Sequence, residues 1–289
     1  MSVVLQSILA GLGGMLGWGL YDFLGGLFSR KLGNFKTLFW SQLAGMALAL
    51  ALAAASAMPW RLRPQIALLL AAASVLYALA YLLFFRGFEL GKVSLISATM
   101  NLYAVFTILF AFVLLGQRLS AFQSLGVALI LAGVTLVSLK GADLRQPGVG
   151  LLSGVRETVL AALLFGFFWI LSEIISEEIG WLATTLFVKI GLVLFLLLVG
   201  LVGRKPLGMA GAGARTGLMI ALAGVLEAAA VACVNWGLAV GDVILVTPIA
   251  SALSVVTIGM AVVVMRERIT RVQGAGMLLV LAGIVSTAF

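Results

Sequence analysis

Histidine is absent from the 289-residue chain, cysteine occurs once, and only 10% of the residues are charged. Because histidine is the usual side chain for moving protons near neutral pH, any titrating role must belong to carboxylates. The single Cys233 excludes a disulfide within one chain, and no cysteine or histidine cluster exists to bind a metal. The phosphate-binding patterns GxxxxGKS and GxxxxGKT are also missing, so no metal, ATP or other cofactor is expected.

The small share of charged residues excludes an ordinary soluble domain, in which about 25% of residues are charged. Hydrophobic residues make up 63% of the chain, and its mean hydropathy is +1.24. The sequence therefore predicts an integral membrane protein. Ten apolar stretches have about the 20 residues that a helix needs to cross a bilayer. They are residues 5–28, 37–58, 66–85, 93–115, 120–139, 158–176, 181–202, 216–238, 243–265 and 272–289.

Residues 84–139 recur, shifted by 150 positions, as residues 234–289, with no gap and 16 identities in 56 positions. Shared polar residues, such as Arg118 with Arg268, are not explained by an apolar composition. The match therefore indicates two copies of one structural unit. Each copy holds five of the ten stretches. An odd number of spans makes the second copy enter the bilayer in the opposite direction.

We therefore expect an all-α integral membrane protein, with ten transmembrane helices arranged as two inverted five-helix repeats around a central cavity. The first repeat covers residues 1–139, a linker covers residues 140–157, and the second repeat covers residues 158–289. Inverted repeats of this kind occur in many secondary transporters, whose substrate sites lie near the membrane midplane.

Lysine and arginine are distributed unevenly among the loops between the ten stretches. Fourteen lie on one side, and three lie on the other, namely Arg61, Arg63 and Arg118. Because cytoplasmic loops carry the excess of these residues, both termini are predicted on the outer side of the cytoplasmic membrane of a bacterium or archaeon. The same loop residues account for the net charge of +8 without a nucleic-acid partner.

Charged residues within the apolar stretches are the strongest functional candidates, because each costs about 2.5–3.5 kcal/mol at a helix centre. Four are present: Asp22, Glu173, Lys189 and Glu227. Glu227 lies in the middle of its stretch, which favours a role as a cavity-lining or proton-binding group. The alternative is a structural role, in which Glu227 makes an interhelical hydrogen bond or pairs with Lys189; in such a pair both charges belong to the scaffold.

The first copy has Tyr77 at the position of Glu227, and Tyr81 follows one turn later on the same face. Both tyrosines are therefore candidate substrate-binding residues.

Asp22 and Glu173 each follow a tryptophan by four residues, Trp18 and Trp169 respectively. This spacing places the ring and the carboxylate on the same face of a helix. The recurrence favours an aromatic ring and an acid that face a shared cavity. The alternative is that both acids lie near helix ends and contact lipid headgroups or loop arginines.

The fourth and ninth stretches carry further polar candidates at matched positions. Ser97 and Asn101 share one helix face in the first copy, and Thr247 and Ser251 correspond to them in the second. All four are candidate substrate contacts.

Pro248 removes one backbone hydrogen bond from the ninth stretch, so a kink that serves as a hinge is predicted there. The first copy has Ala98 at this position. The two copies are therefore not expected to bend equally.

A turn at residues 116–120 reads Gly-Gln-Arg-Leu-Ser, and its copy at residues 266–270 reads Arg-Glu-Arg-Ile-Thr. These turns, each followed by a glutamine and spaced glycines, resemble the EamA domain of the drug/metabolite transporter superfamily. The resemblance covers both halves, and thus nearly the whole chain. Gln117 replaces the acid that is usual in the family, and Ala98 replaces its usual proline.

The resemblance implies an exporter or exchanger of small metabolites with a central cavity lined by the first, third, fourth, sixth, eighth and ninth helices. In this sequence those helices carry Trp18, Asp22, Tyr77, Tyr81, Asn101, Trp169, Glu173, Glu227 and Ser251. These tyrosines and tryptophans make the expected cavity similar to that of the family's exporters of aromatic and other hydrophobic amino acids.

We therefore expect a non-enzymatic secondary transporter that exports amino acids by alternating access. Nucleobases, sugar nucleotides and cationic drugs are alternative substrates, and an intramembrane lipid enzyme or a membrane scaffold is the alternative class. The expected partners are a small-molecule substrate and the lipid bilayer, and the chain acts as a monomer or a homodimer. Protons are an optional coupling ion, because a facilitator needs no titrating group.

Overall fold

The computed structural model of the chain describes residues 2–56, 63–90, 96, 99–138, 154–205, 207–209, 212–266, 270–287 and 289. Every regular element within these ranges is a helix. Helices are the expected solution inside a bilayer, because no water is present there and each segment must satisfy its own backbone N–H and C=O groups. The predicted all-α class is confirmed.

The helices follow one another along the chain with short connections. Their bounds are α1 (Val3–Leu32), α2 (Asn34–Ala55), α3 (Pro64–Leu90), α5 (Leu102–Phe110), a π-helical turn η1 (Ala111–Leu115), α6 (Ala121–Ser138), α7 (Val155–Ile179), α8 (Trp181–Val202), α9 (Ala214–Val240), α10 (Val243–Ala250), α11 (Leu253–Met265) and α12 (Arg271–Ser286).

Seven segments of the described chain are long and apolar enough to cross a membrane. They are Val3–Gly25, Asn34–Ala55, Pro64–Gly87, Val155–Ile179, Trp181–Val202, Ala214–Val240 and Val243–Val264. Three shorter apolar helices accompany them, at Leu102–Leu115, Ala121–Val137 and Arg271–Ser286. Each of the ten predicted stretches overlaps one of these segments, and the start of the fourth lies outside the described residues.

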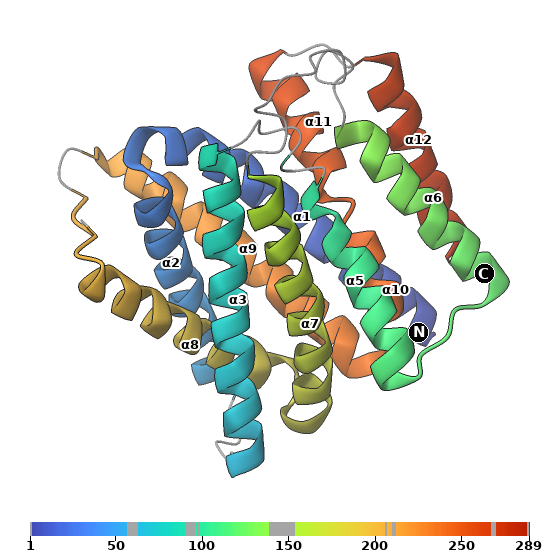
Figure 1. Cartoon of the computed structure of the whole chain (residues 1–289), viewed down its shortest axis with the longest axis horizontal. Helices are drawn as coiled ribbons and strands as arrows, with labels where there is room; N and C mark the ends of the chain where they lie inside the picture. Colours follow the sequence, from blue (N-terminus) through green and yellow to red (C-terminus); the bar gives the residue numbers. More distant parts are fainter. Residues whose placement is uncertain are drawn as a thin grey trace.

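The helices pack in a pattern that is preserved when one copy is exchanged for the other. α1 packs along α9 as α7 packs along α3, and α2 contacts α9 as α8 contacts α3. α6 lies beside α12 at one end of the molecule, and α2 lies beside α8 toward the other end (Figure 1). Because α1, α2 and α3 correspond to α7, α8 and α9 in the repeat, the contacts have the pattern of a two-fold exchange.

The start of α6 and the start of α12 show why glutamine recurs in both copies. The Ser120 backbone N–H donates to the Gln123 side chain at 3.0 Å, and the Gln123 N–H donates to the Ser120 hydroxyl at 3.1 Å. Thr270 and Gln273 make the same two bonds at 3.1 and 3.2 Å. These capping boxes satisfy N–H groups that the first helical turn leaves without partners.

The turns that precede these two caps also share an unusual backbone conformation. Gly116 has a φ of 69°, and Arg266, 150 residues later, has a φ of 56°. Glycine adopts this left-handed conformation without strain, whereas arginine adopts it at a cost of about 1 kcal/mol. The conformation therefore belongs to the repeated unit and is kept even where the residue type disfavours it.

Both copies interrupt a helix at matched residues. α5 begins after Asn101, which has φ −60° and ψ −14°, and α10 ends before Ser251, which has φ −65° and ψ −14°. Pro248 lies within α10, three residues before this break. Ala98 lies outside the described residues. The expected difference in bending between the two copies therefore stays a prediction.

Candidate functional site

Residues that the repeat makes equivalent touch each other in the centre of the molecule. The rings of Trp18 and Trp169 have centroids 5.4 Å apart, and the Tyr77 hydroxyl donates to Oε1 of Glu227 at 2.9 Å. Equivalent residues of two exchanged copies meet only near the axis that relates the copies. The aromatic pair and the Tyr77–Glu227 pair therefore mark the centre where both copies contribute to one site.

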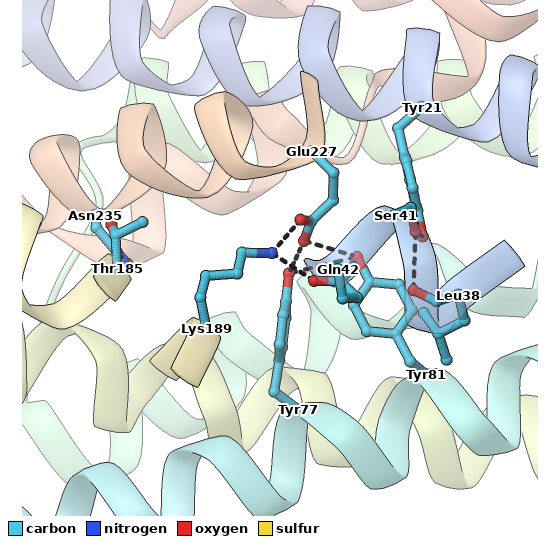
Figure 2. A network of polar contacts seen from close by, with 10 residues as sticks. All are labelled: Tyr21, Leu38, Ser41, Gln42, Tyr77, Tyr81, Thr185, Lys189, Glu227 and Asn235. Atoms are coloured by element: carbon cyan, nitrogen blue, oxygen red, sulfur yellow. Dashed lines mark hydrogen bonds and ion pairs between the residues drawn. The ribbon is translucent and has the colours of Figure 1, made fainter. Parts of the chain in front are cut away.

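Glu227 of α9 and Lys189 of α8 form an ion pair, and both side chains are 0% exposed. Lys189 Nζ also donates to Oε1 of Gln42, on α2, at 2.7 Å. Figure 2 shows that these side chains converge from three helices. The structure bears out the pairing with Lys189 that the sequence left as an alternative.

Side chains of α3 bind the other carboxylate oxygen of Glu227, Oε1. Tyr77 and Tyr81 both donate to Oε1, at 2.9 and 3.3 Å, and their hydroxyl oxygens are 3.4 Å apart (Figure 2). Their spacing of four residues puts both hydroxyls on the same face of α3. Hydrogen bonds to a charged acceptor are about twice as strong as neutral ones. The carboxylate is thus held by two hydroxyls and one ammonium in a fixed orientation.

Aromatic side chains of α7 surround this polar centre. Tyr77 lies against Phe165, Phe168 and Trp169, with ring centroids 5.4, 4.2 and 6.4 Å away. Phe165 also lies 5.1 Å from the ring of Tyr81. In such surroundings charge interactions are stronger than in water, because few polar groups are available to screen them.

Glycines allow the helices that carry the network to approach closely. A Cβ on Gly224 of α9 would overlap the backbone carbonyl of Ser41, and a Cβ on Gly45 of α2 would lie 2.7 Å from the Gly224 carbonyl oxygen. Small residues at helix interfaces in membranes permit this kind of backbone approach. Ser41 precedes Gln42 directly, so this contact brings the amide of Gln42 within reach of Lys189.

A second buried polar chain lies beside the ion pair and was not predicted. Ser172 donates to Oδ1 of Asn235 at 2.8 Å, and Asn235 donates to the Thr185 hydroxyl at 2.9 Å. Thr185 lies one turn before Lys189 on α8. Gln42 was missed as well, although a glutamine within an apolar stretch is itself a signal of an interhelical hydrogen bond.

Glu173 binds the start of α10, whereas its sequence pattern favours an acid that faces a shared cavity. Its Oε1 accepts hydrogen bonds from the Val243 backbone N–H at 3.0 Å and from the Gln117 amide at 2.7 Å. The amide oxygen of Gln117 accepts the next N–H, that of Ile244, at 3.2 Å. Glu173 and Gln117 thus bind the first N–H groups of α10, where a helix favours negative charge.

This contact joins distant parts of the chain. Gln117 belongs to the turn between η1 and α6 in the first copy, whereas Glu173 and α10 belong to the second. The alternative expectation, an acid near the end of its own helix that contacts headgroups or loop arginines, differs from this arrangement. Glu173 lies within α7, and its hydrogen bonds go to Gln117 and to the start of α10.

Replacing Glu173 with alanine is expected to destabilise the protein by about 1–3 kcal/mol, because buried N–H donors at the start of α10 lose their acceptor. Glu178→Ala on the same helix is the matched control. Glu178 is half exposed and lies 3.8 Å from Arg63, so its removal should cost about 0–1 kcal/mol. Thermal unfolding in detergent measures both, and equal shifts in the two variants would rule out the capping role.

Asp22 is placed differently from its counterpart Glu173. Its half-buried carboxylate makes no hydrogen bond or ion pair with the residues that the structure describes. Trp18, one turn earlier, and Tyr103 are buried, and neither the indole N–H nor the phenol hydroxyl has a partner in the described chain. Asp22 acts electrostatically on Tyr103. Asp22 thus offers a negative charge, and Trp18 and Tyr103 each offer a hydrogen-bonding group without a partner in the described chain.

Two of the remaining predicted contacts, Thr247 and Ser251, are hydrogen-bonded to the backbone of their own helix. Thr247 donates to the Val243 carbonyl at 2.8 Å, and Ser251 donates to the Pro248 carbonyl at 2.7 Å. Asn101 is buried at the matched break. Ser97 lies outside the described residues. The hydroxyls of Thr247 and Ser251 therefore stabilise the backbone around the break of the ninth stretch.

A family model described as the EamA-like transporter family matches residues 5–139 and again residues 152–289. The chain belongs to this family. Membership makes it a multi-pass membrane protein of two EamA repeats in the drug/metabolite transporter superfamily, and points to a non-enzymatic transporter of small molecules. The family predicted from the two turns is confirmed.

A solved structure named "Crystal structure of protein" is similar to this EamA-like chain over 97% of its length and over 94% of that chain. The TM-score is 0.81 at 16% sequence identity, and 29 solved chains match in all. An identity this low shows that the fold is shared and nothing more. No curated protein sequence matches the chain.

Proposed function

We propose that this EamA-like protein is a secondary transporter that exports amino acids with aromatic or other hydrophobic side chains across the cytoplasmic membrane by alternating access. The observation that carries the proposal is the fully buried Lys189–Glu227 pair, set among tyrosines, phenylalanine and tryptophan where the two copies meet. Buried ionisable groups in membrane spans are costly and mark substrate or ion pathways.

The architecture in this proposal is ten transmembrane helices in two inverted repeats, with residues 1–139 and 158–289 joined by a linker. The exchange pattern of the helix contacts and the matched caps of α6 and α12 support it. Five spans in each repeat place the two copies in opposite directions across the bilayer. The loop arginines and lysines then put both termini outside the cytoplasm.

Both ends of an amphipathic amino acid find suitable groups in the centre. Trp18, Trp169 and Tyr77 offer aromatic faces, which attract apolar groups and ammonium ions. Asp22, whose carboxylate has no partner among the described residues, offers a negative charge for the substrate ammonium. We place the substrate between these groups, in a central cavity that opens alternately to the two sides.

Alternating access needs elements that can change their relative positions. The breaks at Asn101 and Ser251 divide helices of both copies into shorter segments, and Pro248 removes one further hydrogen bond from α10. The bonds of Glu173 and Gln117 to α10 tie the two copies together. We propose that the break near Pro248 acts as a hinge and that these bonds open when the site changes sides.

Counterflow in proteoliposomes tests the proposed substrate class. Vesicles preloaded with L-phenylalanine should accumulate labelled L-phenylalanine or L-tryptophan faster than vesicles without protein. Nucleobases and sugar nucleotides should give no such exchange. The carboxylate of Asp22, which has no partner within the described part of the chain, favours organic cations as the second candidate, so a monovalent organic cation belongs in the same panel. Exchange of the cation without exchange of any amino acid would refute amino-acid export.

A further inference from the structure

The polar network at Lys189 leaves hydrogen-bond donors without acceptors. The ammonium has three N–H groups, and the structure shows one bond to Glu227 and one to Gln42. Gln42 must turn its oxygen toward Lys189, because an ammonium can only donate. Its Nε2 amide faces the Tyr21 hydroxyl instead, but it is buried and makes no hydrogen bond of normal geometry among the described residues.

Two hydroxyls complete the network. Tyr77 and Tyr81 both donate to Oε1 of Glu227, while Oε2 accepts from Lys189. Buried donors without acceptors are rare in folded proteins, because each costs about 1–3 kcal/mol. The Nε2 amide of Gln42 is next to the oxygen that accepts from Lys189, so this amide and the ammonium lie close together. Together they offer N–H groups that a further acceptor can bind.

We propose that the substrate's carboxylate binds to Lys189 Nζ and Gln42 Nε2, beside Glu227, and that this binding takes up one proton. The inference rests on the proposed function and identifies the residues that bind the substrate's negative charge. Asp22 is then the opposite pole, which receives the ammonium group.

The proton follows from charge balance. Before binding, one ammonium neutralises one carboxylate, that of Glu227. A second carboxylate at the same ammonium leaves one negative charge in excess in a buried, weakly screened centre. Two carboxylates that share such a site do not both stay ionised, so one proton is held between them. That proton comes from the aqueous solution, no covalent bond changes, and its release accompanies substrate release.

None of the other groups around Glu227 competes with it for this proton. α8 presents Lys189, and α3 presents Tyr77 and Tyr81. α1 carries Tyr21, whose ring lies 6.4 Å from that of Tyr81, and Asp22, which is assigned to the substrate's ammonium group. α2 presents the neutral amide of Gln42. α7 presents aromatic rings at this point, and α10 contains no titratable side chain. Tyrosine hydroxyls stay protonated near neutral pH, so only the two carboxylates change.

The test compares two ligands on the purified wild-type chain. L-Phenylalanine carries a carboxylate, and L-phenylalaninol keeps the ring and the ammonium but has a hydroxymethyl group in its place. Calorimetry in buffers of different ionisation enthalpy gives the number of protons taken up. We expect about one proton for L-phenylalanine, with affinity falling about tenfold per pH unit between pH 6 and 8, and none for L-phenylalaninol.

A variant assigns the proton to a residue. Glu227→Gln keeps the shape of the side chain but cannot hold the proton, so uptake with L-phenylalanine should fall from about one to about zero. Glu178→Gln, the same change at a half-exposed position, should keep the uptake of the wild type. The comparison of the two ligands needs no variant, so it stands even if Glu227→Gln fails to fold.

The outcomes separate this inference from the proposed function. Amino-acid counterflow together with binding that takes up no proton would overturn the inference and leave the function standing. Equal proton uptake with both ligands, or full uptake in Glu227→Gln, would also overturn it. Absence of both binding and counterflow for every amino acid would overturn the proposed function, and the inference with it.

Discussion

Lys189→Met is expected to destabilise the protein by about 3–5 kcal/mol, because it leaves the carboxylate of Glu227 buried without a counter-charge. Both side chains are 0% exposed, so water cannot replace the lost ammonium. The tyrosines continue to donate to Oε1 of Glu227, but Oε2 loses its donor. Thermal unfolding in detergent should show a large drop in the unfolding midpoint, and less folded protein should be recovered from the membrane.

The double variant Lys189→Met with Glu227→Gln should recover most of that loss. It removes both charges, and the carbonyl oxygen of the new amide at position 227 can still accept from Tyr77 and Tyr81. Replacing a buried ion pair by neutral groups is often close to neutral for stability. A double variant as unstable as Lys189→Met would show that the charges themselves hold the fold together.

Gly224→Ala should also strongly destabilise the protein. The new Cβ would overlap the carbonyl of Ser41 in the backbone of α2, so the two helices must separate. Overpacking of this kind costs about 1–3 kcal/mol or more, and a clash with backbone belongs at the upper end. Because Ser41 precedes Gln42, the separation should also weaken the bond from Lys189 to Gln42. Unfolding midpoints and ligand affinity should both fall.

Gly217→Ala on the same helix provides the matched control. A Cβ on Gly217 would meet no atom within 4 Å among the described residues. Alanine favours a helix over glycine by about 0.5–1 kcal/mol, so this variant should be unchanged or slightly more stable. A neutral result for Gly224→Ala alongside it would contradict the close approach of α2 and α9.

The sequence predicts the helical class and the membrane location because both depend on length and apolar composition, which each segment carries by itself. It also shows that Tyr77 and Glu227 occupy equivalent positions of the repeat. The structure adds that they contact each other, through a hydrogen bond at 2.9 Å. The sequence shows that Gln123 recurs as Gln273 but gives no reason for it. The two capping boxes explain the recurrence.

The roles of the acids could not be read from the sequence in the same way. Asp22 and Glu173 follow their tryptophans with the same spacing, yet Glu173 binds the start of α10 while Asp22 has no partner among the described residues. Spacing fixes which face of a helix a side chain occupies, but it does not fix which other helix that face meets. The bonds from Gln117 and Gln42 depend on contacts between helices far apart in the chain, which repeat matching does not reveal.

The central claim is that the buried network at Lys189 and Glu227 serves transport and is not needed for the fold. Counterflow of L-phenylalanine by the double variant Lys189→Met with Glu227→Gln tests it most directly, with Glu178→Gln reconstituted in parallel. The account predicts a double variant with an unfolding midpoint near that of the wild type and counterflow reduced by about tenfold or more, since the lost charged hydrogen bonds are worth about 1.5–3 kcal/mol. Counterflow at the wild-type rate by a well-folded double variant would contradict it.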